Sequence, residues 1–258
     1  MEFLRRGGWE RVLVGESGAE VYRRGEIYAK WCQPGGVAEL RGERDRVEWL
    51  AGTGIPGARV ADWIELVDGA ALLTTAVPGV SGDELPASRR TADNLAAVVK
   101  ALHEIPTDDC PFERRLDDVI SQAADVVLRG AVNPEFLTDE WRLVPPEQLL
   151  AGLYAELAEV EAKAELVVCH GDACLPNFLF DPDTLECTGV IDIGRLGVAD
   201  RYADLALLKA QLEDEWSVDA ADFLQTYGLT EPDAQRLTFY RLLDSLTWPR
   251  PVSGPEGT

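Results

Sequence analysis

The stretch VVCHGDACLPNFLFDPDTLECTGVIDIGR, residues 167–195, alternates between apolar and polar sequence. Its apolar runs are typical of strands, and between the first two of them His170, Asp172 and Asn177 fall within eight residues. The chain has two histidines, and His170 is one of them. Side chains that can act as acids, bases or metal ligands are thus concentrated between two elements that a core would hold in place. The segment is either a polar turn on a well-packed protein or an active site.

Asp172 and Asn177 stand in the pattern D-x-x-x-x-N. That is the spacing of the protein-kinase catalytic loop, in which the Asp orients the attacking hydroxyl and accepts its proton and the Asn holds a magnesium ion. A loop of this length can turn so that both side chains face one cleft. Because Asp and Asn are also common in turns, this pair alone does not decide between the two interpretations.

Asp192 follows an apolar run in VIDIGR and precedes Gly194 by two residues. This is the pattern of the kinase D-F-G element, whose Asp binds magnesium. The residues between Asn177 and Asp192 contain a turn signal, DPDT, and a return strand, CTGVI. Such a hairpin would bring Asp192 beside Asn177. The alternative is that Asp192 is only a polar residue at the end of a strand.

Two earlier residues, Lys30 and Glu43, extend the pattern. Lys30 lies in the strand-like IYAKW, where a nucleotide-binding Lys would lie. Glu43 shares a helical face with Val47 and Leu50, so it is drawn toward the core, where a carboxylate needs a cationic partner. We predict Lys30 as that partner, as in the ion pair that positions ATP phosphates in kinases. The alternative for Glu43 is a solvated helix with scattered charges. The backbone N–H groups of GESG (15–18) could cover phosphates, and the alternative for this segment is a plain hairpin turn.

The pattern of apolar residues predicts an α+β protein with two lobes. The first 80 residues contain short strands around one helix, the remainder is mostly helical, and the Pro- and Gly-rich PGVSGDELP (78–86) is a candidate linker. Strands are expected at 9–14, 19–24, 26–31, 58–66, 70–77, 166–169, 177–180 and 188–193, and helices at 40–54, 91–105, 145–163, 203–216 and 232–246.

These elements divide the chain into three parts. We expect an antiparallel-sheet N-terminal lobe with one helix at 1–77, a larger, mostly helical lobe at 78–248, and a flexible Pro- and Gly-rich tail at 249–258. Clefts between lobes are preferred ligand sites.

Composition and charge narrow the possible functions. The 258 residues are 46% hydrophobic, which supports a packed core, and the formal net charge of −22 argues against a nucleic-acid binder. That charge suits a cationic ligand, or it reflects solubility alone. The N-terminal sequence lacks the apolar run of a signal peptide, and no stretch reaches the roughly 20 apolar residues of a membrane span, so we expect a cytoplasmic protein without a membrane partner. Five cysteines without a C-x-x-C pair indicate reduced thiols rather than disulfides or zinc ligands.

The motifs occur in the order that a kinase needs, and residues 167–207 resemble the signature region of the aminoglycoside phosphotransferases. GESG, GERDRVEWL and CPFERRL agree as well, so the resemblance covers nearly the whole chain. It implies a protein-kinase-like two-lobe fold and an enzyme that transfers the γ-phosphoryl group of ATP, or of GTP, with Mg²⁺ to a cationic aminoglycoside. The implied enzyme is a monomer that confers antibiotic resistance.

Within the family, CPFERRL, NPEFL, CTGVIDIGRLG and FYRLLDSLTW are most similar to the streptomycin 3''-phosphotransferases. The 3''-hydroxyl of streptomycin is therefore the expected acceptor. The 3'-phosphotransferases of kanamycin and neomycin are the alternative, as is another small-molecule kinase acting on choline, a sugar or a macrolide. A nucleotide-binding pseudokinase without activity is a third possibility, which the intact motif residues disfavour.

The resemblance also implies roles for single residues. Asp172 matches the catalytic base, Asn177 and Asp192 match the magnesium ligands, and Lys30 and Glu43 match the ion pair that binds the phosphates.

Further matches concern nucleotide and drug. Ser17 matches a loop residue close to the β-phosphate, and Thr75 and Val77 fall where the interlobe hinge offers backbone groups to adenine. On the terminal helix, Asp244 and Trp248 are candidate drug contacts, with helix surface and core aromatic as their alternatives. Carboxylates that could gather a cationic drug in the helical lobe include Asp200, Glu213, Asp214 and Asp244.

The remaining matches are structural. His170 supports the catalytic loop, Arg195 helps to order the metal-binding segment, and Asp204 braces the loop. One departure is that protein kinases have H-R-D where this chain has H-G-D, with Gly171 in the middle. The missing Arg implies that no activation-loop phosphate is clamped, which fits a constitutively active small-molecule kinase.

Overall fold

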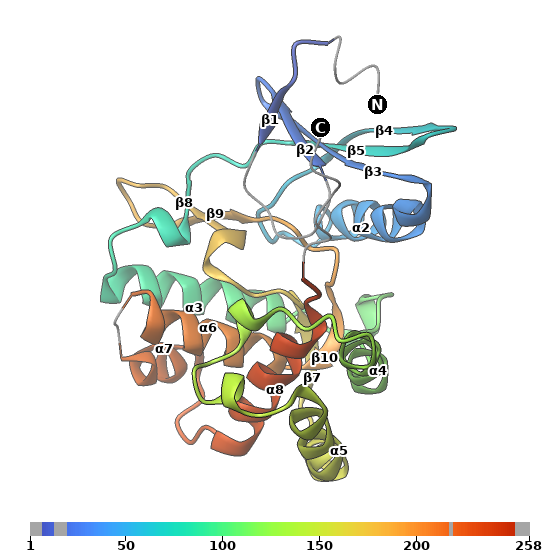
Figure 1. The fold of residues 1–258 in the computed structure, drawn as a ribbon. Helices are drawn as coiled ribbons and strands as arrows, with labels where there is room; N and C mark the ends of the chain where they lie inside the picture. Colours follow the sequence, from blue (N-terminus) through green and yellow to red (C-terminus); the bar gives the residue numbers. More distant parts are fainter. Residues whose placement is uncertain (1–6, 13–19, 217–218, 251–258) are drawn as a thin grey trace.

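The computed structural model describes residues 7–12, 20–216 and 219–250, and these form two lobes (Figure 1). The GESG loop with Ser17, and the tail from residue 251 onward, lie outside the described residues. All five cysteines have free thiols. None of the helices within the described ranges has both the length and the apolar composition that crossing a membrane requires.

The N-lobe is built on a five-stranded antiparallel sheet with the strand order β1-β2-β3-β5-β4. Side chains alternate between the two faces of β5: Ala70 and Leu72 pack toward α2, and Ala71 and Leu73 pack with Trp31 on the other face. This strand is therefore buried on both faces, which explains its nearly continuous apolar sequence. The elements are β1 (Glu10–Val12), β2 (Glu20–Arg24), β3 (Ile27–Cys32), α2 (Val37–Leu50), β4 (Val60–Leu66) and β5 (Gly69–Thr75).

Helices dominate the C-lobe, as predicted. In α3, Ser88 caps the first turn by accepting the N–H of Thr91, and the predicted apolar stripe of Leu95, Val99 and Leu102 is buried. Each such buried side chain stabilises the fold by roughly 1.5 to 3 kcal/mol. The helix α8 packs against α4, α5 and α6. The helices are α3 (Arg89–His103), α4 (Leu116–Leu128), α5 (Pro146–Ala162), α6 (Tyr202–Asp214), α7 (Ala220–Tyr227) and α8 (Ala234–Thr247).

The C-lobe also contains two small sheets, β10-β7 and β6-β8-β9. The strands β8 and β9 form the predicted hairpin, with Phe178 opposite Val190, and β6 pairs with β8. The strand β7, at the predicted LVVC, pairs with β10, which sequence patterns did not indicate. The bounds are β6 (Val80–Ser81), β7 (Leu166–Cys169), β8 (Phe178–Phe180), β9 (Cys187–Val190) and β10 (Gly197–Asp200). The predicted fold class, a small sheet lobe with one helix and a larger helical lobe, is confirmed.

The two lobes touch through α2, through the loop that follows it, where the carbonyl of Pro56 accepts the N–H of Val190 at 2.9 Å, and through the Lys30–Asp192 pair. Arg46 Nε donates to the carbonyl of Leu196 at 2.7 Å, and its guanidinium lies 4.7 Å from the ring centroid of Phe112. Trp49 Nε1 donates to the carbonyl of Asp109 at 3.0 Å. The chain itself crosses between the lobes after β5 and before β6, and we keep residue 77 as the proposed boundary.

Candidate active site

The catalytic-loop candidate begins where β7 ends. The carboxylate of Asp204, at the start of α6, accepts the backbone N–H of His170 at 2.6 Å and of Gly171 at 2.9 Å. The N–H of Asp172 donates to His170 Nδ1 at 3.3 Å, so His170 Nε2 donates to the carbonyl of Ile191 at 3.0 Å. His170 is fully buried and thus connects the loop to the segment after β9.

Asp172 and Asn177 face each other across the loop. Asn177 Nδ2 donates to the backbone carbonyl of Asp172 at 2.9 Å and lies 3.4 Å from its carboxylate Oδ2. The amide oxygen of Asn177 accepts no hydrogen bond from the described residues. The five-residue spacing therefore brings both side chains to one place, as the sequence predicted.

The β8–β9 hairpin brings Asp192 beside them. The N–H of Ile191 donates to the carbonyl of Asn177 at 3.0 Å, which joins the end of the hairpin to the catalytic loop. Asp192 has a φ of 56°, in the left-handed region, at a cost of about 1 to 2 kcal/mol for a residue with a side chain. The carboxylate of Asp192 has contacts with the N-lobe.

Lys30 provides those contacts. Lys30 Nζ lies 2.8 Å from Asp192 Oδ1 and 2.9 Å from Glu43 Oε2, so one ammonium is shared by two carboxylates. The predicted Lys30–Glu43 ion pair is thus present, and its side chains are largely buried. Burial alone would lower the pKa of Lys30, but the two carboxylates raise it above the ordinary value.

The two carboxylates respond differently to this environment. Burial raises the pKa of Glu43, although Lys30 opposes the effect. Burial also acts to raise the pKa of Asp192, but Lys30 outweighs it, and the pKa of Asp192 is lowered. Asp192 is therefore ionised at neutral pH. At Asp172, burial raises the pKa, with Arg195 opposing.

His103 is a site residue that sequence reasoning missed. Its Nε2 donates to Asp204 Oδ2 at 3.0 Å, and its Nδ1 accepts the hydroxyl of Tyr227 at 2.8 Å. Burial alone would raise the pKa of Asp204. The hydrogen bond from His103 acts in the opposite direction, and the net pKa of Asp204 is below its ordinary value. The available signal was position: His103 is the second histidine of the chain and immediately follows the buried stripe of α3.

Arg195, Asp244 and Trp248 form one cluster. The guanidinium of Arg195 lies 3.9 Å from the ring centroid of Trp248, and Arg195 Nη1 lies 3.7 Å from Asp244 Oδ1. Trp248 Nε1 donates to Asp244 Oδ2 at 3.2 Å, and the Trp248 ring stacks on Phe136 with 5.6 Å between centroids. Burial raises the pKa of Asp244 to about 6, although Arg195 opposes the effect.

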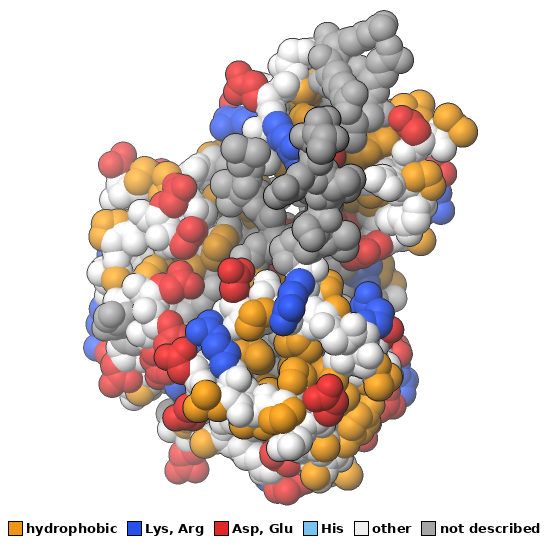
Figure 2. All heavy atoms as spheres, viewed as in Figure 1, with side chains coloured by type: hydrophobic (Ala, Val, Ile, Leu, Met, Phe, Trp, Pro, Cys, Tyr) orange, Lys and Arg blue, Asp and Glu red, His pale blue; other side chains and the backbone are white. Residues whose placement is uncertain are grey.

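A cavity of about 890 Å³ adjoins these groups and is strongly acidic. Acidic side chains also outnumber basic ones over the face of the C-lobe in Figure 2. The cavity is lined by eight carboxylates and two guanidiniums: Asp83, Glu135, Asp139, Asp172, Asp192, Asp214, Glu215 and Asp244, with Arg142 and Arg241.

Two carboxylates that the sequence suggested for this purpose lie elsewhere. Asp200 is buried in an ion pair with Arg236, and Glu213 pairs with Lys209 at 2.7 Å. Both are engaged in intramolecular ion pairs away from the cavity, whereas Asp214 and Asp244 line it as expected.

The hinge candidates, Thr75 and Val77, lie at the end of β5. Thr75 N–H donates to the carbonyl of Arg59 at 2.9 Å, and the Thr75 hydroxyl accepts the N–H of Arg59 at 3.0 Å. The backbone N–H and carbonyl of Val77 have no hydrogen-bond partner in the part of the chain that the structure describes. Val77 therefore has backbone groups available for a ligand, whereas the N–H of Thr75 is already used.

The chain is similar to known proteins over nearly its whole length. A model of the phosphotransferase enzyme family matches residues 7–240. Streptomycin 3''-kinase of Streptomyces griseus is 51% identical, over 94% of this chain and 93% of that protein. Aminoglycoside 3'-phosphotransferase of Streptomyces fradiae is 43% identical, over 92% of this chain and 94% of that protein. The structure of aminoglycoside phosphotransferase APH(3'')-Id from Streptomyces rimosus in complex with ADP and streptomycin is 45% identical and superposes with a TM-score of 0.88, covering 95% of this chain and 96% of that one.

Proposed function

The chain belongs to the phosphotransferase enzyme family, and we propose that it transfers the γ-phosphoryl group of ATP to the 3''-hydroxyl of streptomycin. The observation that carries this proposal is the position of Asp172, which lines a carboxylate-rich cavity together with Asp192 of the Lys30–Glu43–Asp192 charge cluster. The similarity to a streptomycin 3''-kinase and to a streptomycin-bound structure supports the choice of acceptor.

The acidic cavity supports a cationic acceptor. Eight carboxylates against two guanidiniums attract a drug that carries guanidinium groups and raise its local concentration. Each guanidinium of the cavity already has a carboxylate partner: Arg142 lies 3.0 Å from Asp139, and Arg241 lies 2.6 Å from Asp214. We propose Asp244 and Trp248 as drug contacts because both line this cavity and are held in place by Arg195 and Phe136.

On the nucleotide side, Lys30 and Glu43 are proposed to hold the ATP phosphates. The ammonium of Lys30 keeps its charge because its pKa is raised, so it can neutralise a phosphate. The N–H and carbonyl of Val77 support the adenine-binding role proposed for Thr75 and Val77, and Ser17 remains our proposal for the β-phosphate. GTP is the alternative nucleotide.

The proposed magnesium ligands, Asn177 and Asp192, fit a hard cation. The free amide oxygen of Asn177 and the carboxylate of Asp192 are both oxygen donors, and both residues line the cavity next to Asp172. When bound, Mg²⁺ would neutralise charge on the phosphate oxygens. The lowered pKa of Asp192 keeps this donor ionised.

Asp172 is proposed to orient the acceptor hydroxyl and to take its proton on a carboxylate oxygen. Transfer of a γ-phosphoryl group depends mostly on positioning and charge neutralisation, so the Asp need not be a strong base. The rigidity of the loop matters more, and the hydrogen bonds of Asp204 and His170 provide it. Since one chain contains all of these groups, we propose a monomeric enzyme that uses cytoplasmic ATP and confers resistance by modifying the drug.

Mass spectrometry tests the proposal directly. Streptomycin and kanamycin are incubated separately with the protein, ATP and Mg²⁺, and the site of any modification is located by NMR. We expect one added phosphate on the 3''-oxygen of streptomycin and none on kanamycin. Phosphate on kanamycin alone would favour a 3'-phosphotransferase, and no modification of either drug would favour a kinase for another small molecule.

A further inference from the structure

Backbone hydrogen bonds fix the position of Arg114 near the catalytic loop. The segment before α4 runs alongside β10: the N–H of Val198 donates to the carbonyl of Phe112 at 2.8 Å, and the N–H of Arg114 donates to the carbonyl of Val198 at 3.0 Å. The segment is thus joined through β10 to β7, the strand that leads into the loop.

The side chain of Arg114 fills the space beside Gly171. Gly171 has a φ of +80°, and a Cβ added there would lie 3.0 Å from Arg114 Cδ and 2.2 Å from the carbonyl oxygen of Arg195. No side chain fits at this position. The middle residue of the H-G-D triplet is therefore a glycine because of its backbone conformation and the close Arg195 carbonyl, and the Arg114 side chain packs against it as well.

The guanidinium of Arg114 faces carboxylates without touching one. Within the described residues it forms no hydrogen bond and no ion pair, although burial and the neighbouring Arg195 lower its pKa. Three carboxylates act on it in the opposite direction: Asp244, Asp204 and Asp172. A guanidinium remains charged in a protein, and keeping one partly buried without a direct partner is unfavourable for stability alone.

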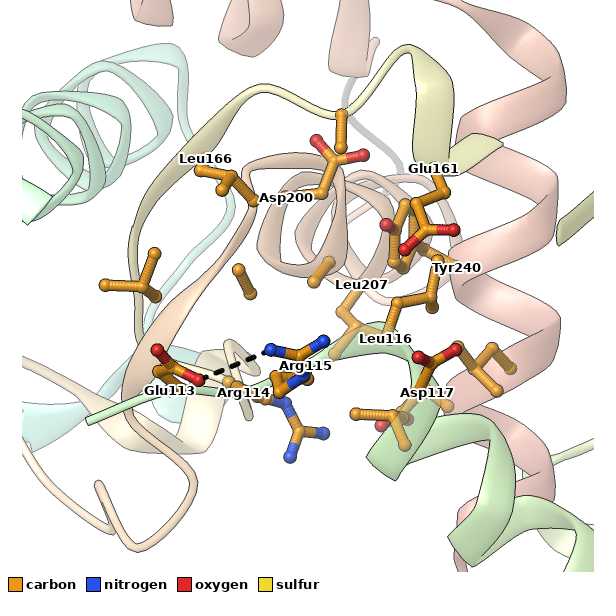
Figure 3. Close-up of a pocket in the computed structure, with 18 residues that line it drawn as sticks. Glu113, Arg114, Arg115, Leu116, Asp117, Glu161, Leu166, Asp200, Leu207 and Tyr240 are labelled. Atoms are coloured by element: carbon orange, nitrogen blue, oxygen red, sulfur yellow. Dashed lines mark ion pairs between the residues drawn. The ribbon is translucent and has the colours of Figure 1, made fainter. Parts of the chain in front are cut away.

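Arg115, the next residue, has different surroundings. It pairs with Glu113 at 3.8 Å, and both side chains are more than half exposed (Figure 3). Both arginines line a second cavity, of about 360 Å³, whose wall also includes Gly171 and Asp244. The two neighbours thus provide a matched comparison: one faces the catalytic loop and the other faces solvent.

We propose that Arg114 is a positioning residue of the phosphotransferase reaction. Its guanidinium supplies, from a different segment, the cation that the H-G-D triplet lacks, and by its packing and its charge it holds Gly171 and Asp172 toward the acceptor hydroxyl. This inference rests on the proposed function, because it assigns Arg114 a part in the same reaction.

The test compares Arg114→Met, Arg114→Lys and Arg115→Met with the wild type. The amount of nucleotide-binding protein is measured by ATP titration, and kcat and KM are then determined for ATP and for streptomycin per nucleotide-binding site. Arg114→Met should lower kcat by about 10- to 100-fold, the effect of misplacing a catalytic group by about 1 Å, while the KM for ATP changes less than about threefold. Arg114→Lys should recover part of the kcat, and Arg115→Met should match the wild type.

These readouts separate positioning from a merely structural role. A structural role would reduce the number of nucleotide-binding sites and leave kcat per site unchanged, and that result would overturn the inference. Equal kcat values in Arg114→Met and Arg114→Lys would also overturn it, because the positive charge would then be irrelevant. Absence of streptomycin phosphorylation in the wild type would instead contradict the proposed function. ATP hydrolysis by the same variants is measured in parallel, so that the comparison at Arg114 does not depend on the acceptor.

Discussion

At the scale of single residues, the candidate site is a set of charges whose partners fix their protonation. Lys30 is shared by Glu43 and Asp192, and Asp172 stands apart from this cluster with Asn177 as its neighbour. Asp172 lines the cavity and forms no ion pair with the described residues, which leaves its oxygens available to a hydroxyl group.

Replacing Asp172 by Asn should remove this function and little else. Asn has the same shape and keeps the contact with Asn177, but it cannot accept the proton of the acceptor. We expect kcat to fall by about 10²- to 10⁴-fold, as for the loss of a general base, with the Kd of ATP nearly unchanged. Steady-state kinetics and calorimetric ATP titration check this, and near wild-type turnover would end the assignment.

Asp244 should make stability depend on pH. Its pKa is about 6 when folded, against an ordinary value of 3.8, because the carboxylate is buried. Below pH 4 it is protonated in both the folded and unfolded states, and between pH 4 and 6 it is protonated mainly in the folded state. Above pH 6 it is ionised in both states, and the folded protein carries the cost of a buried charge. The contribution of Asp244 to stability is therefore present below its unfolded pKa and is lost as the pH rises through 6.

Asp244→Asn removes this titration and keeps an acceptor for Trp248 Nε1. The variant should gain stability relative to the wild type as the pH rises from 4.5 to 7, by at most roughly 3 kcal/mol, given about 1.4 kcal/mol for each unit of pKa shift. Urea unfolding across this range measures the difference. Parallel pH curves for the two proteins would contradict the expectation.

Much of the residue-scale site was predictable, and the reasons are local. The spacing of Asp172 and Asn177 and the helical face of Glu43 are properties of short segments, so the loop geometry and the Lys30–Glu43 pair followed from them. The second contact of Lys30, with Asp192, joins residues 162 positions apart and depends on how the lobes dock. His103 and Arg114 could not be assigned for the same reason, since their partners come from distant segments.

At the scale of elements, the catalytic loop is braced from behind by three helices. His103 on α3 reaches Asp204 on α6 and Tyr227 on α7, and Asp204 holds the backbone of the loop. This arrangement links α7, an element with no catalytic motif of its own, to the geometry of the site.

His103→Ala should remove the hydrogen bonds that join α3 to α6 and α7 and so destabilise the fold. The change removes a buried side chain and leaves the Asp204 carboxylate short of one donor, so we expect a loss of about 2 to 4 kcal/mol in the free energy of unfolding. Chemical denaturation measures it, with Glu104→Ala, an exposed residue at the same helix end, as the control. A loss below about 0.5 kcal/mol would mean that the contact is not part of the fold's stability.

The helices and strands that sequence patterns failed to indicate are α4, α7, β6 and β10. Leu116–Leu128 has apolar residues at helical spacing, but many of them are Val, Ile or Ala, which bury less area or favour strands, so the periodic signal is weak beside that of the Leu-rich helices. The strand β10 is four residues long and begins at Gly197, and only its pairing with β7 defines it.

At the scale of the whole molecule, charge is the dominant property. The net charge of −22 could be read from the composition. The place where the carboxylates converge could not, because Asp83, Glu135 and Asp214 come from three separate segments of the chain. The acidic cavity is therefore a property of the tertiary fold rather than of any motif.

Salt should weaken the encounter between the enzyme and streptomycin. Screening shortens the reach of the acidic field to about 10 Å at 0.1 M salt and to about 3 Å at 1 M. We expect kcat/KM for streptomycin to fall by about tenfold between low and high ionic strength, with kcat at saturation nearly constant. Initial rates at several salt concentrations measure this, and an effect confined to kcat would point to the chemical step instead.

The docking of α2 on the C-lobe has a consequence for ligand affinity. Arg46 and Trp49 fix the helix that carries Glu43, so the Lys30–Glu43 pair is held by the same contacts that hold the lobes together. A protein that spends only a small fraction of its time in a binding-competent arrangement has its affinity reduced by that fraction. Contacts that hold the two lobes together raise this fraction, so they reduce the penalty on nucleotide affinity. The contact between the lobes thus serves the phosphate-binding ion pair as well as the packing of the fold.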